Sequence, residues 1–439
     1  MPLTSSLRSQ LWFSTFTVVS LAMLAKLCGA LKEVAMAKQL GTSELVDQFV
    51  FAFTVATWPA ALATSVLTMA LTPLLAKMKP RDDGSNERFM AQLWGASLAV
   101  SVFLGLVLWA VFPLLSPVAR DGGARLAMMV GAVTFLSSLS ALLGVILMCR
   151  GNQIGTLLEG LPSLVLGLLL VVGIWQADVV LIYGVLFGMA VQLALLWRIH
   201  SRQLGSIFIA WPRNSPQWSA FGTSLGYTTA GCAVYATVTL ADIAIASRFE
   251  AGSVASLGYA ARITALATGL IATAVHRVAI VYFCKAQLQQ IERAAAHHTM
   301  WFRVLCVFFS GSLALSLVLI YFSDELVSLI FQRGQFDAVA SEKVAHLMRW
   351  SVAQLAPYVG AAVMCAYLSA TGGFREIFLA CLVGFSGHML LACAGAAYSG
   401  LAAIAAAPLF AHVAMLVFLL IVVVKRQAPK PVFQASLQT

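Results

Sequence analysis

Long apolar runs separated by short polar stretches dominate the chain. Runs of about 20 residues are long enough to cross the hydrocarbon core of a bilayer as α-helices. The pattern therefore predicts an all-α polytopic membrane protein with about twelve transmembrane helices. The expected spans are residues 11–38, 46–76, 88–116, 124–149, 155–175, 179–199, 219–247, 254–284, 299–322, 343–369, 375–396 and 400–424.

A polar stretch with Pro212 and Pro216 lies near the middle of the sequence and leaves six expected spans on each side. The turns that contain Gly41 and Gly252 fall at corresponding points of the two halves, which favours two like-oriented repeats. We expect an N-lobe of helices 1–6 (1–205), a cytoplasmic linker (206–217), a C-lobe of helices 7–12 (218–426) and a short cytoplasmic tail (427–439).

Composition and charge distribution fix the class and the orientation. Of the 439 residues, 61% are hydrophobic and 10% are charged, whereas a soluble domain carries about 25% charged residues. The expected cytoplasmic segments hold 16 Lys and Arg residues against 6 in the expected outer segments. This bias predicts that both termini are cytoplasmic, and the net charge of +10 needs no nucleic acid to explain it.

The sequence holds no P-loop, no HExxH and no GxSxG, and its loops are too short for a catalytic domain. We expect no enzyme, no catalytic residue and no metal site. None of the eight cysteines forms a CxxC pair, so we interpret them as unpaired packing thiols. Prolines within or near the ends of the spans predict kinked or broken helices, at positions 59, 73, 162, 357 and 408.

Three cations, Lys26, Lys32 and Arg262, lie inside expected spans. A charge at mid-bilayer costs roughly 2.5–3.5 kcal/mol on insertion scales, so such groups survive where they face a protein interior or a watery cavity. The three cations indicate a cavity for an anionic ligand. Glu33 lies seven residues after Lys26, which places both on one face of a helix.

Structural interpretations of these charges stay open beside the functional one. Lys32 can snorkel near the outer interface. Arg262 can form a structural salt bridge with Asp242 or Asp47, and Asp242 is a candidate cation or proton site. Glu159, about a turn inside the fifth span, is interpreted as an interfacial group.

Several segments, taken in order, resemble the MurJ/MviN family. In KLCGALKEVAMAKQLGTSELVDQF the family's basic, glycine and acidic places are filled by Lys26, Gly29, Lys32, Glu33, Gly41 and Asp47, with lysine where the family generally has arginine. The passage DIAIASRFEAGSVASLGYAARI puts Arg262 on the family's cavity arginine, and LIFQRGQFDA resembles its loop between helices 9 and 10. The stretch after Arg150 resembles the entry to helix 5.

The resemblance implies a flippase of the multidrug/oligosaccharidyl-lipid/polysaccharide (MOP) exporter superfamily in the bacterial inner membrane, with two six-helix lobes around a central cavity. Its partners would be the lipid bilayer, a polyprenyl-diphosphate-linked saccharide and glycan-assembly proteins. Lys26, Lys32 and Arg262 would bind the diphosphate, with Glu33, Asp47 and Asp242 in supporting or ion-coupling roles. No cofactor is expected; the drive would be a coupled cation or the membrane potential.

Two departures from the family pattern keep the glycan open. Members that flip the peptidoglycan precursor usually have two more helices after the twelfth and an arginine in the middle of helix 2, where this chain has TVATWPAALA. An exopolysaccharide or O-antigen-type unit is therefore an alternative to a lipid II-like substrate. A cation-coupled drug exporter of the same fold and a non-transporting scaffold of envelope assembly are further alternatives.

Overall fold

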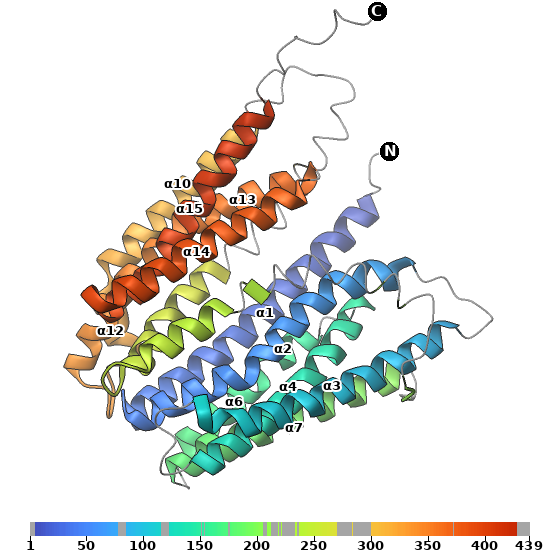
Figure 1. The fold of residues 1–439 in the computed structure, drawn as a ribbon, viewed down its shortest axis with the longest axis horizontal. Helices are drawn as coiled ribbons and strands as arrows, with labels where there is room; N and C mark the ends of the chain where they lie inside the picture. The colour runs from blue at the N-terminus through green and yellow to red at the C-terminus, as the bar shows by residue number, and fades with distance from the viewer. Residues whose placement is uncertain are drawn as a thin grey trace, which may run out of the picture. The chain divides into compact units, whose positions relative to one another are not determined.

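The computed structural model describes residues 5–77, 85–115, 123–150, 152, 154–173, 176–204, 209–211, 218, 221, 233–234, 237–269, 283, 300–371 and 373–427. All regular secondary structure in these ranges is helical, and they contain no β-strand (Figure 1). The predicted all-α architecture is confirmed.

The helices follow the apolar runs of the sequence. They are α1 (Ser5–Leu40), α2 (Glu44–Lys77), α3 (Ser85–Leu115), α4 (Gly123–Cys149), α5 (Ile154–Leu158), α6 (Leu161–Val172), α7 (Ala177–Leu204), α10 (Met300–Tyr321), α11 (Ser323–Phe331), α12 (Ala338–Ala353), α13 (Leu355–Ala370), α14 (Phe374–Ser399) and α15 (Leu401–Gln427). Two further helical stretches cover 237–246 and 253–269.

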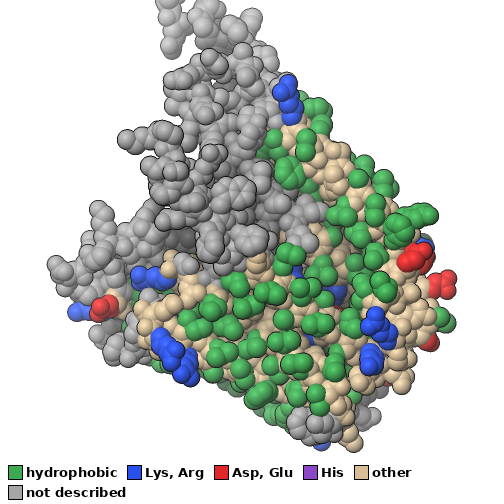
Figure 2. Space-filling model, turned by 180° about the vertical axis from the view of Figure 1, so that it is seen from behind, with side chains coloured by type: hydrophobic (Ala, Val, Ile, Leu, Met, Phe, Trp, Pro, Cys, Tyr) green, Lys and Arg blue, Asp and Glu red, His purple; other side chains and the backbone are tan. Residues whose placement is uncertain are grey.

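Nine helical segments of the described residues are long and apolar enough to cross a membrane. The spans expected at 219–247 and 254–284 are described only over 237–246 and 253–269. Hydrophobic side chains cover most of the described surface in Figure 2, and charged side chains are sparse on it. Such a surface matches hydrocarbon rather than water, so the chain is a multi-pass membrane protein.

Prolines explain two of the helix breaks. The fifth expected span is split between α5 and α6, where Pro162 occupies the first turn of α6, and the tenth is split at Gln354, three residues before Pro357. Proline lacks the N–H needed inside a helix, which favours a new helix start at these points. By contrast, α15 continues through Pro408, and α2 through its two prolines. The short helix α11 was not predicted.

The chain divides into two compact units, which do not coincide with the expected lobes. The first comprises Met1–Arg262 and Asp324–Leu347, and the second comprises Ile263–Ser323 and Met348–Thr439. The expected linker 206–217 lies mostly outside the described residues, so the lobe boundaries stay a prediction.

In the first unit, small residues bring helix backbones into direct contact. A Cβ added at Gly160 would lie 2.7 Å from the Cα of Ala25, and one at Gly167 would lie 3.2 Å from the Cα of Lys32. These contacts seat α6 on α1. The hydroxyl of Thr134 in α4 donates to the carbonyl of Ala56 in α2 at 3.0 Å. Small residues and hydroxyl hydrogen bonds are the usual means of packing helices in lipid.

The second unit is built on α13, which packs against α10, α14 and α15. Its core contains Trp301, Val359, Met364 and Leu419, all buried. The Ser316 hydroxyl of α10 donates to the carbonyl of Val352 at 3.0 Å. This bond satisfies a carbonyl next to the break between α12 and α13, where the helical ladder is interrupted.

Candidate functional site

One buried carboxylate, that of Glu33, holds two cations in the first unit. Its Oε1 lies 3.0 Å from the Nζ of Lys32 and 3.0 Å from the Nε of Arg262. Lys32 and Glu33 are consecutive residues of α1, and Arg262 comes from the helix 253–269. The Nζ of Lys32 also lies 5.3 Å from the centre of the Phe53 ring, a distance at which cation and ring attract. We call Lys32, Glu33 and Arg262 the charge cluster.

Burial divides the charge cluster into a dry pair and an open cation. Lys32 and Glu33 are each 5% exposed, whereas the side chain of Arg262 is 51% exposed. Two cations share one carboxylate, so the cluster keeps a net positive charge, and that charge is accessible at Arg262. A guanidinium presents a planar edge of donors that matches phosphate or carboxylate oxygens. The cluster can therefore bind an anion through Arg262.

Lys26, the third predicted cation, lies apart from the charge cluster. It is exposed and lies six residues before Lys32 on α1, or about 9 Å along the helix axis. Its charge acts on the carboxylate of Glu159, which lies at the break between α5 and α6. Glu159 is exposed, and its interfacial position stays a prediction.

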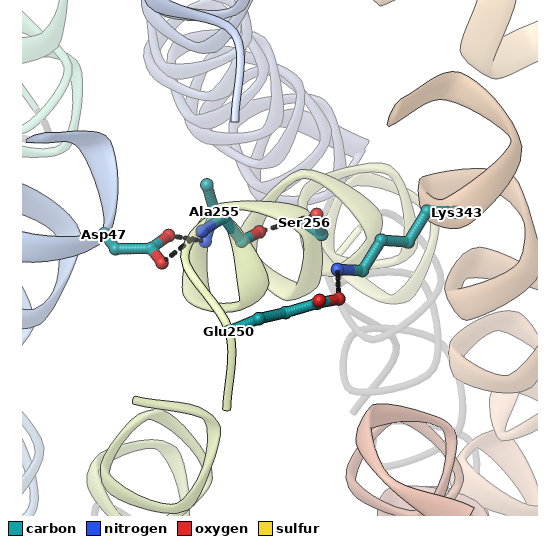
Figure 3. Close-up of polar contacts among 6 residues, drawn as sticks. Asp47, Glu250, Ala255, Ser256 and Lys343 are labelled. Atoms are coloured by element: carbon teal, nitrogen blue, oxygen red, sulfur yellow. Dashed lines mark hydrogen bonds and ion pairs between the residues drawn. The ribbon is translucent and has the colours of Figure 1, made fainter. Parts of the chain in front are cut away.

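Asp47 is bound by backbone amides. Its Oδ2 accepts from the N–H of Gly252 and its Oδ1 from the N–H of Ala255, both at 2.7 Å (Figure 3). These amides belong to the first turn of the helix 253–269 and the residue before it, where N–H groups lack helical partners and a negative charge is favoured. Asp47 is thus a cap for a helix distant in sequence, and the alternative of an Arg262–Asp47 salt bridge is wrong: Arg262 pairs with Glu33.

Three turns are fastened together around Asp47. The Tyr259 hydroxyl donates to the carbonyl of Gly41 at 3.1 Å, and the amide of Gln335 donates to the carbonyl of Lys38 at 3.0 Å. Gly252 has φ +85°, and a Cβ added there would lie 2.4 Å from the carbonyl oxygen of Thr42, so only glycine fits. We call Asp47 together with these turns (residues 38–42, 251–259 and 333–337) the loop cluster.

An exposed ion pair lies beside the loop cluster. The Nζ of Lys343 donates to Oε1 of Glu250 at 2.8 Å (Figure 3). This hydrogen bond and the charge of Lys343 lower the pKa of the Glu250 carboxyl below its usual value. Because the pair is exposed, solvent and salt screen it, and it contributes little to stability.

The structure brings together only some of the predicted site residues. Lys32, Arg262 and Glu33 meet, Lys26 and Asp47 lie elsewhere, and Asp242 is half-buried in the helix 237–246. Sequence reasoning paired Glu33 with Lys26 by helical spacing and missed its position between Lys32 and Arg262. The consecutive Lys32 and Glu33 carried the signal, because opposite charges inside an apolar run need a partner at hand.

A family model described as lipid II flippase MurJ matches residues 36–438. A curated relative, the probable lipid II flippase MurJ of Rhizobium meliloti (strain 1021), is 25% identical over 364 residues, which are 76% of this chain and 65% of the relative. The match spans 65% of the length of that relative, which is slightly less than two thirds.

Solved structures share the fold. A lipid II flippase MurJ in an inward closed conformation matches with TM-score 0.78 and 16% identity over 93% of this chain and 87% of that one. An inward-facing multidrug resistance MATE family transporter of the MOP superfamily matches with TM-score 0.68 and 14% identity over 95% and 99% of the two chains. The family model covers most of the sequence, and the resemblance seen in the sequence is confirmed: this chain belongs to the MurJ lipid II flippase family, within the MOP superfamily fold.

Proposed function

We propose that this protein moves a polyprenyl-diphosphate-linked saccharide from the inner to the outer leaflet of the bacterial inner membrane. The single observation that carries the proposal is the charge cluster, in which the carboxylate of Glu33 leaves one net positive charge, accessible at Arg262. Membership of the MurJ family supports the choice of substrate class. The protein acts as a transporter and breaks no bond of its substrate.

The physical task is to carry a diphosphate across hydrocarbon. A diphosphate loses its hydration and counterions on entering the membrane, and charge-assisted hydrogen bonds from cations replace them. Arg262 supplies donors at its exposed edge, and Lys26 supplies a second, separate cation. The buried Lys32 acts through Glu33: it offsets the carboxylate charge that would otherwise repel the substrate. The lipid tail stays in the bilayer while the protein alternates its access.

Transport of a labelled lipid in proteoliposomes tests this function. A fluorescent polyprenyl-diphosphate disaccharide is placed in the vesicles, and its arrival in the opposite leaflet is followed by quenching. Arg262→Gln is expected to reduce the flipping rate at least tenfold. The diphosphate would lose one charged hydrogen bond, worth about 1.5–3 kcal/mol, while it crosses the membrane. Arg262→Lys retains the charge and is expected to lose less.

The matched control is Arg125→Gln, which removes an exposed arginine at the start of α4. Equal rates for wild type, Arg262→Gln and Arg125→Gln would refute the anion-binding role. Running the assay with a peptidoglycan-type and an O-antigen-type saccharide determines which is carried. We propose the peptidoglycan type, because the matching family model is described as a lipid II flippase and lipid II is the precursor of peptidoglycan.

The alternative exporter of organic cations requires acidic groups open to a ligand. Asp47 and Asp242 are the acidic groups that such an exporter could use. Both carboxylate oxygens of Asp47, however, accept hydrogen bonds from backbone amides. Uptake of an organic cation against a sodium or proton gradient would favour the exporter. A scaffold role would be favoured if envelope assembly survived variants that abolish flipping.

We further propose that both termini are cytoplasmic and that a coupled cation or the membrane potential drives the cycle. The excess of Lys and Arg in the expected inner segments supports the orientation. Protease accessibility of a C-terminal tag in oriented vesicles tests it. Flipping measured with the potential clamped to zero, with and without a sodium or proton gradient, separates the two sources of energy.

A further inference from the structure

A pocket whose wall is largely apolar but carries several polar side chains lies inside the first unit, apart from the charge cluster. Its volume is about 340 Å³, and helices α2, α4, α5 and α7 line it together with the polar residues beside α5. The polar groups on its wall include Thr57, Thr64, Ser140, Asn152, Glu159 and Gln192. A water molecule takes roughly 30 Å³ in the liquid, so the space far exceeds the size of a single bound water or ion.

Two buried polar side chains line the pocket, and one of them has an unsatisfied hydroxyl. Ser140 is 6% exposed, and its Oγ makes no hydrogen bond within the described part of the chain. Gln192 is also 6% exposed and carries both a donor and an acceptor. A polar group withdrawn from water without a partner is costly, so the Ser140 hydroxyl would gain a hydrogen bond by turning toward a polar ligand in the pocket.

The remaining wall offers acceptors and a donor. Thr57 and Thr64 donate their hydroxyl protons to the carbonyls of Phe53 and Ala60, at 2.8 and 2.9 Å. The oxygen lone pairs of the two hydroxyls can then accept hydrogen bonds from a ligand. Asn152 uses Oδ1 to accept from the amide of Ile154 at 3.0 Å, which leaves its NH₂ group as a donor. Alternating donors and acceptors of this kind suit the hydroxyl groups of a sugar.

The charges at the mouth disfavour a metal ion. Glu159 is the acid on the pocket wall, and the charge of Lys26 offsets its carboxylate. The break that carries Glu159 lies against α1, since a Cβ added at the next residue, Gly160, would lie 2.7 Å from the Cα of Ala25. A single carboxylate in the field of a cation is a poor site for a metal ion, which needs several oxygen ligands, but it can accept hydrogen bonds from neutral hydroxyl groups.

We propose that this pocket is the subsite for the saccharide part of the lipid-linked substrate, with Lys26 at the junction between sugar and diphosphate. The inference rests on the proposed function and adds to it the place where the glycan is recognised. Lys26 lies between the two regions: the residue after Glu159, Gly160, packs against Ala25 next to Lys26, and Lys32 of the charge cluster lies about 9 Å further along the same helix.

Binding to purified protein in nanodiscs tests the subsite. Two probes are compared by intrinsic tryptophan fluorescence: a short-chain polyprenyl diphosphate, and the same lipid carrying one sugar. In the wild type the sugar is expected to tighten binding about tenfold, as two or three hydrogen bonds would. Gln192→Leu and Ser140→Ala are expected to reduce this sugar increment and to leave binding of the sugar-free lipid unchanged.

The chain supplies a matched control on the same helix. Ser138 is also buried in α4, and its Oγ also lacks a hydrogen bond to described residues, but it does not line the pocket. Ser138→Ala should therefore keep the full sugar increment. Thermal melting of each variant checks that it is folded, and Ser140→Ala, the mildest change, keeps the test valid if Gln192→Leu does not fold.

The outcomes separate this inference from the proposed function. If neither lipid binds the wild type, both the proposed function and the saccharide subsite are refuted. The saccharide subsite alone is refuted if the sugar-free lipid binds through Arg262 and the sugar does not increase the affinity. It is also refuted if Ser140→Ala and Gln192→Leu both keep the full increase in affinity that the sugar gives. Saturable sodium binding that Glu159→Gln abolishes and that competes with the sugar-bearing lipid would replace the subsite with a cation site.

Discussion

Two carboxylates of the first unit, the half-buried Asp47 and the buried Glu33, have opposite surroundings. Asp47 in the loop cluster gives one oxygen to each of two backbone amides, and these partners carry no net charge. Glu33 in the charge cluster gives a single oxygen to two cations, which leaves positive charge over. The same chemical group therefore fastens segments of the chain in one place and holds two cations, the basis of the proposed anion site, in the other. The hydrogen-bond and ion-pair partners of each carboxylate determine which of the two roles it has.

The strongest way to break the charge cluster is Glu33→Gln. This change leaves Lys32, 5% exposed, without its counter-charge. Removing one member of a buried ion pair costs about 3–5 kcal/mol, so we expect a large fall in the thermal unfolding midpoint of the purified protein. The double variant Lys32→Met, Glu33→Gln is expected to recover most of that loss.

Glu342→Gln removes an exposed carboxylate and serves as the control, with an unchanged midpoint expected. A Glu33→Gln protein as stable as the wild type, or a double variant no more stable than the single one, would contradict the buried-pair interpretation. The double variant also tests the role of Lys32, because its flipping rate should stay close to that of the wild type.

Asp47→Ala breaks the loop cluster. Two hydrogen bonds to a charged group are lost, and we expect destabilisation of about 2–4 kcal/mol. Asp47→Asn keeps one acceptor oxygen and should lose about half as much. Glu44→Ala is the control, because Glu44 lies in the first turn of the same helix and is exposed. Equal melting midpoints for Asp47→Ala and Glu44→Ala would show that the loop cluster does not depend on Asp47.

Gly252→Ala sharpens the comparison at the backbone. The residue has φ +85°, and the new methyl group would lie 2.4 Å from the carbonyl oxygen of Thr42. The left-handed conformation alone costs roughly 1–2 kcal/mol for alanine, so the melting midpoint should fall. At Gly258, within the helix 253–269, a Cβ would meet no atom within 4 Å. Gly258→Ala should therefore hold or raise the midpoint, and a similar fall in both variants would refute the steric account.

The smallest effect is expected at Glu250, next to the loop cluster. Its hydrogen bond and ion pair with Lys343 lower the pKa of the carboxyl in the folded protein. The folded state then binds a proton less readily than the unfolded state, so the pair stabilises above the usual carboxyl pKa and is lost as the pH falls through the lowered pKa. The melting difference between wild type and Glu250→Gln should be small at pH 7 and should vanish in acid. A difference that grows in acid would contradict this sign.

Hydropathy was sufficient to predict the long helices of the described residues, because a bilayer leaves the chain few other ways to satisfy its backbone, but it did not predict the short helix α11. The breaks near Pro162 and Pro357 followed from proline chemistry. The sites were harder to predict. Helical spacing put Glu33 with Lys26, whereas tertiary packing put it between Lys32 and Arg262. The pocket takes its wall from several helices that are far apart in the sequence, so no local motif reveals it.

The adjacency of Lys32 and Glu33 has a mechanical consequence. Consecutive residues on one helix travel together, so no rigid-body movement of α1 can separate this pair. Arg262 belongs to another helix, and any sliding between that helix and α1 stretches its bond to Glu33 alone. The charge cluster thus contains one bond that stays with α1 and one that can detach, and in the proposed function the phosphate of the substrate would compete only for the second.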